Sequence, residues 1–65
     1  MSKIDDTDRQ LLGLLRDNAR TPLATLAQKV RVSRGTVQNR LRKLEESGVI
    51  TGYTALVDRE KVGLN

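Results

Sequence analysis

Four residues between positions 35 and 42 recur at the spacing of one helix face. At about 100° per residue, this polar face carries Gly35, Gln38, Asn39 and Arg42. Glutamine and asparagine can each donate to and accept from adenine, and arginine can bind guanine through two parallel hydrogen bonds. A glycine would let the backbone approach a duplex closely. The polar face therefore predicts reading of base edges in double-stranded DNA, although the same amides on an exposed helix are commonly only solvated.

Basic residues surround the polar face. The eight acidic residues of the chain all lie outside the stretch from Asn18 to Leu44, and the net charge is +4. A surface of one sign is typical of proteins that meet phosphates, and a merely solubilising face gives the same pattern. Arg40 lies beside the packing side of its helix. For this residue, an ion pair to Asp5 or Asp8 is at least as good an interpretation as a phosphate contact. The candidates for phosphate contacts are Arg20, Lys29, Arg31, Ser33, Arg34, Thr36, Arg40 and Lys43.

Three helices can position these side chains. A first helix is predicted over residues 5–19, with Asp5 as its N-cap and Asp8 close to its N-terminus. A second follows Thr21, a capping residue, with Pro22 at the first helical position, where no donor is lost. The residues that recur on the apolar sides are Leu11, Leu12, Leu14 and Leu15 in the first, and Leu23, Leu26, Ala27 and Val30 in the second.

The third helix is predicted over residues 33–47. Ser33 is its N-cap, and Gly48 suits a left-handed position just past its end. Only two residues separate it from the second helix, which ends near Val30, and two short helices joined by so tight a turn outline a helix-turn-helix. The residues on its packing side are Val37, Leu41 and Leu44.

The segment after Gly48 has a different character. Its sequence, "VITGYTALVD", is rich in β-branched residues and predicts an extended β-strand with a bend at residues 51–52. Apolar residues fall on both of its faces, and a lone strand leaves an unpaired edge. The simplest relief is pairing with the same strand of a second copy, so a homodimer through residues 49–57, the tail segment, is predicted. Residues 58–65 are expected to begin a linker in a longer protein.

Composition limits the other classes of function. The chain has 65 residues, enough for one small domain, with no Cys and no His. Since it also lacks a Gly-rich phosphate loop, the sequence favours neither an enzyme nor a metal site nor a cofactor. It has no signal-peptide core and no apolar run near the roughly 18 residues that span a bilayer, so no membrane partner is expected. A cytoplasmic protein is the default prediction.

Two binding functions other than DNA reading stay open. The same domain could instead bind proteins, and a protein-interaction or dimerisation module without DNA readout would use an exposed apolar patch, such as Leu14 or the tail segment. RNA binding is disfavoured, because single-strand readers typically stack bases on aromatic side chains, and Tyr53 is the one aromatic residue of the chain.

Three stretches of the chain resemble one family of regulators. "IDDTDRQLLGLLRDNAR", "LATLAQKVRVS" and "RLRKLEESGVITGYTALVDREKVGL" are similar to the N-terminal winged helix-turn-helix of the Lrp/AsnC family, the feast/famine regulators. The most specific part is "LEESGVITGYTALVD", which a generic helix-turn-helix would not carry. The resemblance runs from Ile4 to the end and implies a mainly α fold. The implied fold is a three-helix winged helix-turn-helix over residues 4–65, with a C-terminal β-strand and linker.

The resemblance implies sequence-specific DNA binding by a bacterial or archaeal transcriptional regulator. The helix-turn-helix would span residues 23–42, and the recognition helix, residues 33–47, would lie in the major groove. The regulator would be a cytoplasmic, nucleoid-associated homodimer. An amino-acid effector would bind only through a C-terminal domain that is absent here.

Arg31 departs from the family pattern, which usually has glycine in the turn between the two helices. Such a turn commonly needs one residue at positive φ, which glycine adopts freely and which costs a residue with a Cβ about 1 kcal/mol. The sequence therefore predicts a left-handed Arg31, with its cation at the edge of the recognition helix and within reach of a phosphate.

Overall fold

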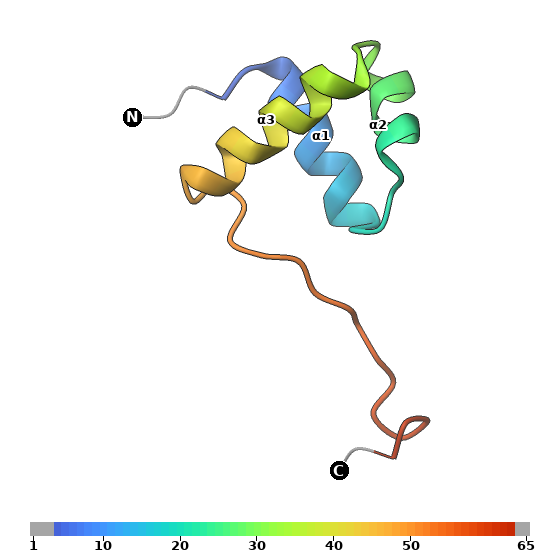
Figure 1. The fold of residues 1–65 in the computed structure, drawn as a ribbon. Helices are drawn as coiled ribbons and strands as arrows, with labels where there is room; N and C mark the ends of the chain where they lie inside the picture. Colours follow the sequence, from blue (N-terminus) through green and yellow to red (C-terminus); the bar gives the residue numbers. More distant parts are fainter. Residues whose placement is uncertain (1–3, 64–65) are drawn as a thin grey trace.

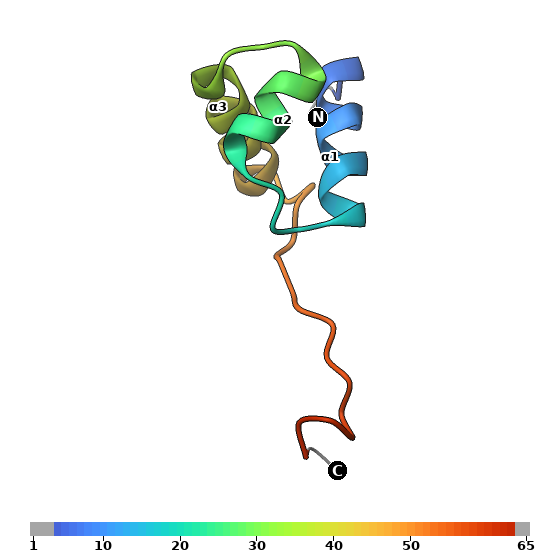
Figure 2. The same cartoon turned by 90° about the vertical axis from the view of Figure 1, so that its right-hand side faces the viewer.

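Three helices make up the folded part of the chain, and an extended segment follows them (Figures 1 and 2). The computed structural model describes residues 4–63. Its helices are α1 (Asp6–Asp17), α2 (Leu23–Val30) and α3 (Arg34–Glu46). The predicted mainly α architecture is confirmed. None of the helices in this range has the length and apolar character needed to cross a membrane.

α1 begins at a reciprocal cap. The Asp5 side chain accepts a hydrogen bond from the Asp8 amide at 2.9 Å, and the Asp8 side chain accepts one from the Asp5 amide at 3.3 Å. Both carboxylates lie at the positive end of the helix dipole. The predicted N-cap is confirmed. The helix ends at Asp17 rather than at residue 19, because the Asn18 backbone is extended (φ −151°, ψ 100°).

The start of α2 differs from the prediction. Pro22 has extended backbone angles (φ −61°, ψ 148°) and is the N-cap, so the first helical residue is Leu23. Thr21 lies one residue before the N-cap, and no side chain caps α2. The Thr21 Oγ1 and amide instead donate to the Asn18 carbonyl, at 2.6 Å and 3.1 Å. The predictions of Thr21 as the cap and of Pro22 at the first helical position are therefore wrong. Thr21 does not accept from the first amides of α2, because the helix begins one residue later than a Thr21 cap would require.

Arg31 closes α2 in a left-handed conformation, as the sequence predicts. Its φ of 61° and ψ of 46° make it the one non-glycine residue with positive φ in residues 4–63. The amides of Arg31 and Val32 both donate to the Ala27 carbonyl, the latter at 3.1 Å. The turn thus satisfies a carbonyl that the end of α2 would otherwise leave unpaired, and it leads directly into α3.

α3 has the caps that the sequence predicts. Ser33 Oγ accepts a hydrogen bond from the Thr36 amide at 3.1 Å, and Gly48 has a φ of 82° just after the helix. The Ile50 amide then donates to the Leu44 carbonyl at 3.0 Å. This bond holds the first residues after the helix against its last turn.

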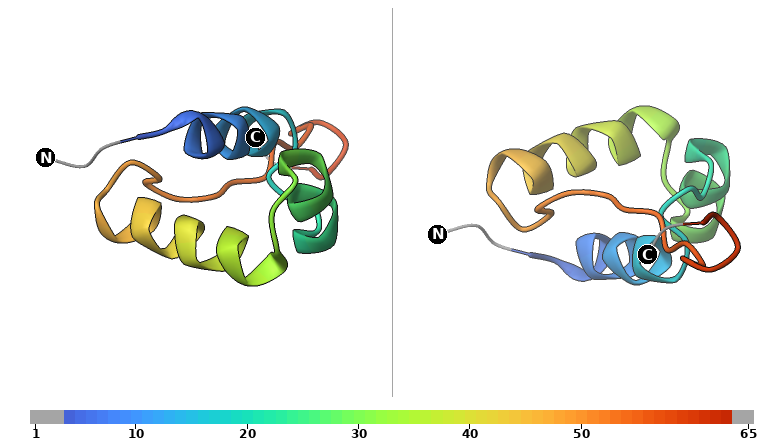
Figure 3. Two further views of the ribbon diagram at one scale, coloured as in Figure 1. Left: turned by 90° about the horizontal axis from the view of Figure 1, so that it is seen from above. Right: turned by 90° about the horizontal axis from the view of Figure 1, so that it is seen from below.

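A small aliphatic core holds the helices together, and α2 contacts both α1 and α3 (Figure 3). The fully buried side chains at its centre are Leu11 of α1, Leu26 of α2 and Val37 of α3. Leu44 is also buried, and Leu41 packs against the core, so the predicted packing side of α3 is confirmed. The other residues of the core and its surround are Ala27, Val30, Leu14, Leu15, Leu23 and Val32.

The tail segment is extended but forms no strand within residues 4–63 (Figure 1). It leaves the helices after Ile50, and the Leu56 side chain is 96% exposed. A strand needs a neighbouring strand for its ladder, so the predicted β-strand stays a prediction for an assembly of two chains. Of the predicted linker, the part that is described turns around the Asp58 carboxylate, and residues 64–65 lie outside the described residues.

Replacement of Arg31 tests the cost of the left-handed turn. Arg31→Gly removes the strain of a Cβ at positive φ, about 1 kcal/mol. Part of this gain is lost because glycine is freer in the unfolded chain. We expect the free energy of unfolding to rise by about 0.5 kcal/mol, measured by urea denaturation followed by circular dichroism.

Arg31→Ala is the matched control for this prediction, because it removes the charge and keeps the Cβ. Arg31→Gly should therefore be more stable than Arg31→Ala. Equal stability of the two variants would mean that the turn carries no strain.

Candidate nucleic-acid interface

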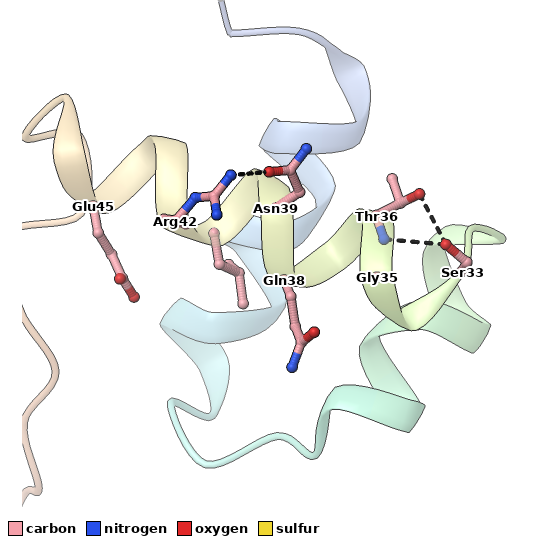
Figure 4. A pocket seen from close by; sticks show the side chains of 8 residues that line it. Ser33, Gly35, Thr36, Gln38, Asn39, Arg42 and Glu45 are labelled. Carbon is pink, nitrogen blue, oxygen red and sulfur yellow. Dashed lines mark hydrogen bonds between the residues drawn. The ribbon is translucent and has the colours of Figure 1, made fainter.

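The residues of the polar face lie together on one shallow surface of α3 (Figure 4). All four of them are exposed. They face solvent because Val37, on the opposite side of the helix, is fully buried in the core. The structure thus brings together Gly35, Gln38, Asn39 and Arg42, and the residues that line the surface with them are Ser33, Thr36, Leu41 and Glu45.

Two side chains of the polar face are joined to each other. Arg42 Nη2 donates a hydrogen bond to Asn39 Oδ1, nearly one turn earlier on the helix (Figure 4). Arg42 forms no ion pair within residues 4–63. Its other N–H groups and the Asn39 amide nitrogen stay available. The pair therefore presents several donors in restricted orientations, which suits bidentate contacts to base edges.

Packing does not require a glycine at position 35. A Cβ there would meet only Ser33 Oγ, at the ordinary contact distance of 3.9 Å. Glycine inside a helix costs about 0.5–1 kcal/mol relative to alanine. The space over the first turn of α3 is therefore open, as the close approach of a ligand backbone would require.

The N-terminal end of α3 is polar and exposed. Ser33 Oγ, which caps the helix, also lies 2.9 Å from Thr36 Oγ1. The amides at a helix N-terminus attract phosphates. Of the predicted phosphate contacts, those that are exposed on α2, on the turn or on α3 are Lys29, Arg31, Ser33, Arg34 and Lys43.

Two other predicted phosphate contacts are placed differently. Thr36 is half-buried in the first turn of α3. Arg20 is exposed, but it follows α1 and lines a groove against that helix and the tail segment rather than the polar face. The structure therefore does not bring Arg20 together with the base-reading candidates.

Arg40 is engaged in an ion pair inside the protein. Its Nη1 donates to the Asp5 carboxylate and lies 3.4 Å from Asp8 Oδ1. The hydrogen bond from Arg40 lowers the pKa of Asp5, and the same bond raises the pKa of Arg40. Asp8 is buried, so this network ties α3 to the capped start of α1. Of the two alternatives that the sequence leaves open for Arg40, the structure contains the ion pair.

Glu45 was not among the residues predicted for this surface. It lies three residues after Arg42 and lines the same surface. Its Oε2 accepts a hydrogen bond from the Tyr53 hydroxyl at 2.6 Å. This hydrogen bond, helped by burial and by the charge of Glu45, raises the pKa of Tyr53 to about 12. The spacing from Arg42 could have identified Glu45, whereas the contact with Tyr53 has no local signal in the sequence.

Salt dependence separates a phosphate ligand from a structural cation. A plot of the logarithm of DNA affinity against the logarithm of salt concentration has a slope of about −0.9 for each phosphate that the protein neutralises. Lys43→Gln should reduce this slope by about 0.9, because Lys43 is exposed. Arg40→Gln should leave the slope unchanged and lower the melting temperature, because it breaks the pair with Asp5. Fluorescence anisotropy with duplex DNA at several salt concentrations measures the slope.

The pair of variants can also contradict this assignment. An equal loss of slope in both would make Arg40 a phosphate ligand. An unchanged melting temperature in Arg40→Gln would show that the ion pair does not hold α3 to α1.

The sequence and fold are similar to those of known regulators. The family described as winged helix-turn-helix DNA-binding matches residues 4–51. The regulatory protein AsnC of Haemophilus influenzae is 40% identical over 63 residues, which are 97% of this chain and 42% of AsnC. The regulator LrpA of Pyrococcus horikoshii is 40% identical over 60 residues, which are 92% of this chain and 43% of LrpA.

A solved structure extends the similarity to three dimensions. LrpC of B. subtilis matches with a TM-score of 0.83 and 34% identity, over 95% of this chain and 44% of LrpC. The chain thus spans less than half the length of each of these three proteins.

Proposed function

The chain belongs to the winged helix-turn-helix DNA-binding family, among the Lrp/AsnC regulators, and from this membership we propose that α3 enters the major groove of double-stranded DNA and reads base edges there. The observation that carries the proposal is the polar face, exposed on a helix whose opposite side is buried. Recognition helices of helix-turn-helix domains contact bases through their N-terminal residues. Gly35, Gln38 and Asn39 lie in the N-terminal half of α3, and Arg42 follows nearly one turn later.

Each residue of the polar face has a proposed role. Gln38 and Asn39 would bind adenine, and Arg42 would bind guanine while it stays hydrogen-bonded to Asn39. Gly35 would allow the duplex to approach the first turn. The proposed phosphate ligands are Lys29, Arg31, Ser33, Arg34, Thr36 and Lys43, with Arg40 excluded because of its ion pair and Arg20 because of its position.

Gly35→Ala tests this placement of α3. Alanine should raise the free energy of unfolding by less than about 0.5–1 kcal/mol, because glycine costs that much in the middle of a helix and Gly35 lies in the first turn. The new methyl group would stand between the helix and the duplex. We expect DNA affinity to fall roughly tenfold, which corresponds to about 1.4 kcal/mol. The measurements are urea denaturation and fluorescence anisotropy with the duplex that the parent chain selects from a random pool.

Gly13→Ala is the matched control, since Gly13 is exposed inside α1 and a Cβ there would meet nothing within 4 Å. It should raise stability without changing DNA affinity. Unchanged affinity in Gly35→Ala would place α3 outside the groove. If the affinity of the parent chain does not change between about 50 and 200 mM salt, phosphate binding is excluded and the protein-interaction alternative is favoured.

We also propose that the tail segment pairs with the same segment of a second copy. Its backbone is extended, and the exposed fractions of Leu56 and Val57 are 96% and 55%. An unpaired edge beside exposed apolar side chains favours pairing with another strand. A two-fold dimer of this kind would present two α3 helices to half-sites about one helical turn apart, or a multiple of that distance.

Leu56→Asp should abolish this self-association, because it places a charge in the paired segment. Val62→Asp is the control, since Val62 is 55% exposed and lies outside residues 49–57. Sedimentation equilibrium of the two variants and the parent measures the association. A parent chain that stays monomeric at high concentration would contradict pairing through the tail segment.

The wider role follows from the same proposal. The protein would act on DNA of the nucleoid in the cytoplasm of a bacterium or archaeon, as a binding protein without catalysis, metal or cofactor. An amino-acid effector would act through a C-terminal domain of the whole regulator, since AsnC and LrpA are each more than twice as long as the part matched here.

A further inference from the structure

Glu45 places a negative charge beside the arginine of the polar face. It lies in the last turn of α3, three residues after Arg42, where side chains on a helix are neighbours. An ion pair at this spacing would occupy the guanidinium that the proposed function assigns to guanine. A carboxylate at this position therefore opposes DNA reading unless something holds it elsewhere.

The structure shows that Glu45 is held elsewhere. Its carboxylate accepts the hydrogen bond from the Tyr53 hydroxyl, and Arg42 donates to Asn39 instead of to Glu45. Figure 4 shows the Arg42 side chain directed toward Asn39 and the Glu45 side chain extending away from Arg42. Each of the two charged groups thus has a neutral partner.

We propose that Tyr53 is a positioning residue for DNA reading, which holds the Glu45 carboxylate away from Arg42 and so leaves the guanidinium free for the duplex. The inference rests on the proposed function, because it assigns Arg42 to DNA. It adds Glu45 and Tyr53 to the residues that determine how α3 reads a sequence.

The path of the chain after α3 explains why Tyr53 can reach Glu45. The Ile50 amide donates to the Leu44 carbonyl at 3.0 Å, which keeps the start of the tail segment against the end of α3. Tyr53 follows three residues later and is 51% exposed, so its ring lies along the surface rather than in the core. Its hydroxyl is protonated at neutral pH, as an ordinary tyrosine with a pKa of about 10 already is, and the bond to Glu45 raises its pKa further.

The helix surface offers Glu45 one other partner. The positions nearly one turn earlier are occupied by Arg42 at i−3 and by Leu41 at i−4, and a leucine cannot pair with a carboxylate. Loss of the Tyr53 hydroxyl would therefore direct Glu45 to Arg42. This loss of DNA affinity would require the charge of Glu45. A variant that lacks this charge therefore separates it from any loss of packing by the Tyr53 ring.

Three variants test the proposal: Tyr53→Phe, Glu45→Gln and the double variant. Tyr53→Phe keeps the ring and removes the donor, and we expect it to weaken binding of the selected duplex about twofold, the strength of one such pair on a helix. In the Glu45→Gln background the same change should have no effect, because an amide carries no charge to neutralise Arg42. Fluorescence anisotropy with the duplex that the parent chain selects measures all four proteins.

A structural role for Tyr53 gives a different pattern. An equal loss of affinity in both backgrounds would mean that the hydroxyl supports the fold and not the position of Glu45, and it would overturn the proposal. No loss in either background would overturn it as well. A parent chain that binds no duplex would instead refute the proposed function itself, independently of the variants.

A second measurement needs no DNA. Tyr53 is the one tyrosine of the chain and there is no tryptophan, so ultraviolet absorbance of the tyrosinate reports this residue alone. The parent should titrate near 12, and Glu45→Gln should move the titration toward the ordinary value of about 10. Identical titrations in the two proteins would show that the hydrogen bond is not formed, and would refute the inference whatever the chain does with DNA.

Discussion

The rotation of α3 about its own axis is the constraint on which the rest of the structure depends. Val37 is fully buried in one cluster with Leu11 of α1 and Leu26 of α2. Burial of such a side chain is worth about 1.5–3 kcal/mol, and this core has no aromatic residue that could replace it. A rotation that brought Arg42 toward the core would expose Val37 and bury a charge. The polar face is therefore exposed because the opposite side of the helix is committed to packing.

Two features at the sides of α3 support this rotation. The left-handed Arg31 sets the direction in which the chain enters the helix, at a cost that a glycine would avoid. Arg40 lies next to the packing side and reaches Asp5 at the start of α1. Because this ion pair is partly exposed, salt and solvent weaken it, so its contribution to stability is modest compared with that of the core. The core determines which face of α3 is buried, and these two features restrict the small rotations of α3 that the core still allows.

Whether a feature of the fold or of the candidate site could be predicted from the sequence depends on whether its physical cause is local. Asp5 and Ser33 accept from backbone amides within a few positions, so their roles as caps are predictable from local sequence and are confirmed. The left-handed Arg31 is predicted from the glycine that the family pattern has at this turn, and it is also confirmed. The start of α2 is less predictable, because a shift of one residue in the beginning of the helix decides whether Thr21 is its N-cap. The partner of Arg40 lies 35 residues away, and spacing alone could not choose it over a phosphate. The predicted strand of the tail segment would need a second strand, and residues 4–63 contain none.

The Tyr53–Glu45 hydrogen bond connects the two surfaces that the proposals assign to different partners. Glu45 belongs to the surface that would meet DNA, and Tyr53 belongs to the segment that would pair with a second copy. Pairing of strands restricts the backbone of the tail segment and with it the position of the Tyr53 ring. The conformational entropy that these residues lose on ordering would then be lost when the dimer forms, and DNA binding would not have to order them again. If the dimer forms as proposed, pairing would order the segment that carries the Tyr53–Glu45 contact, which the single chain already makes. The proposed self-association and the proposed DNA reading would then be linked through one hydrogen bond.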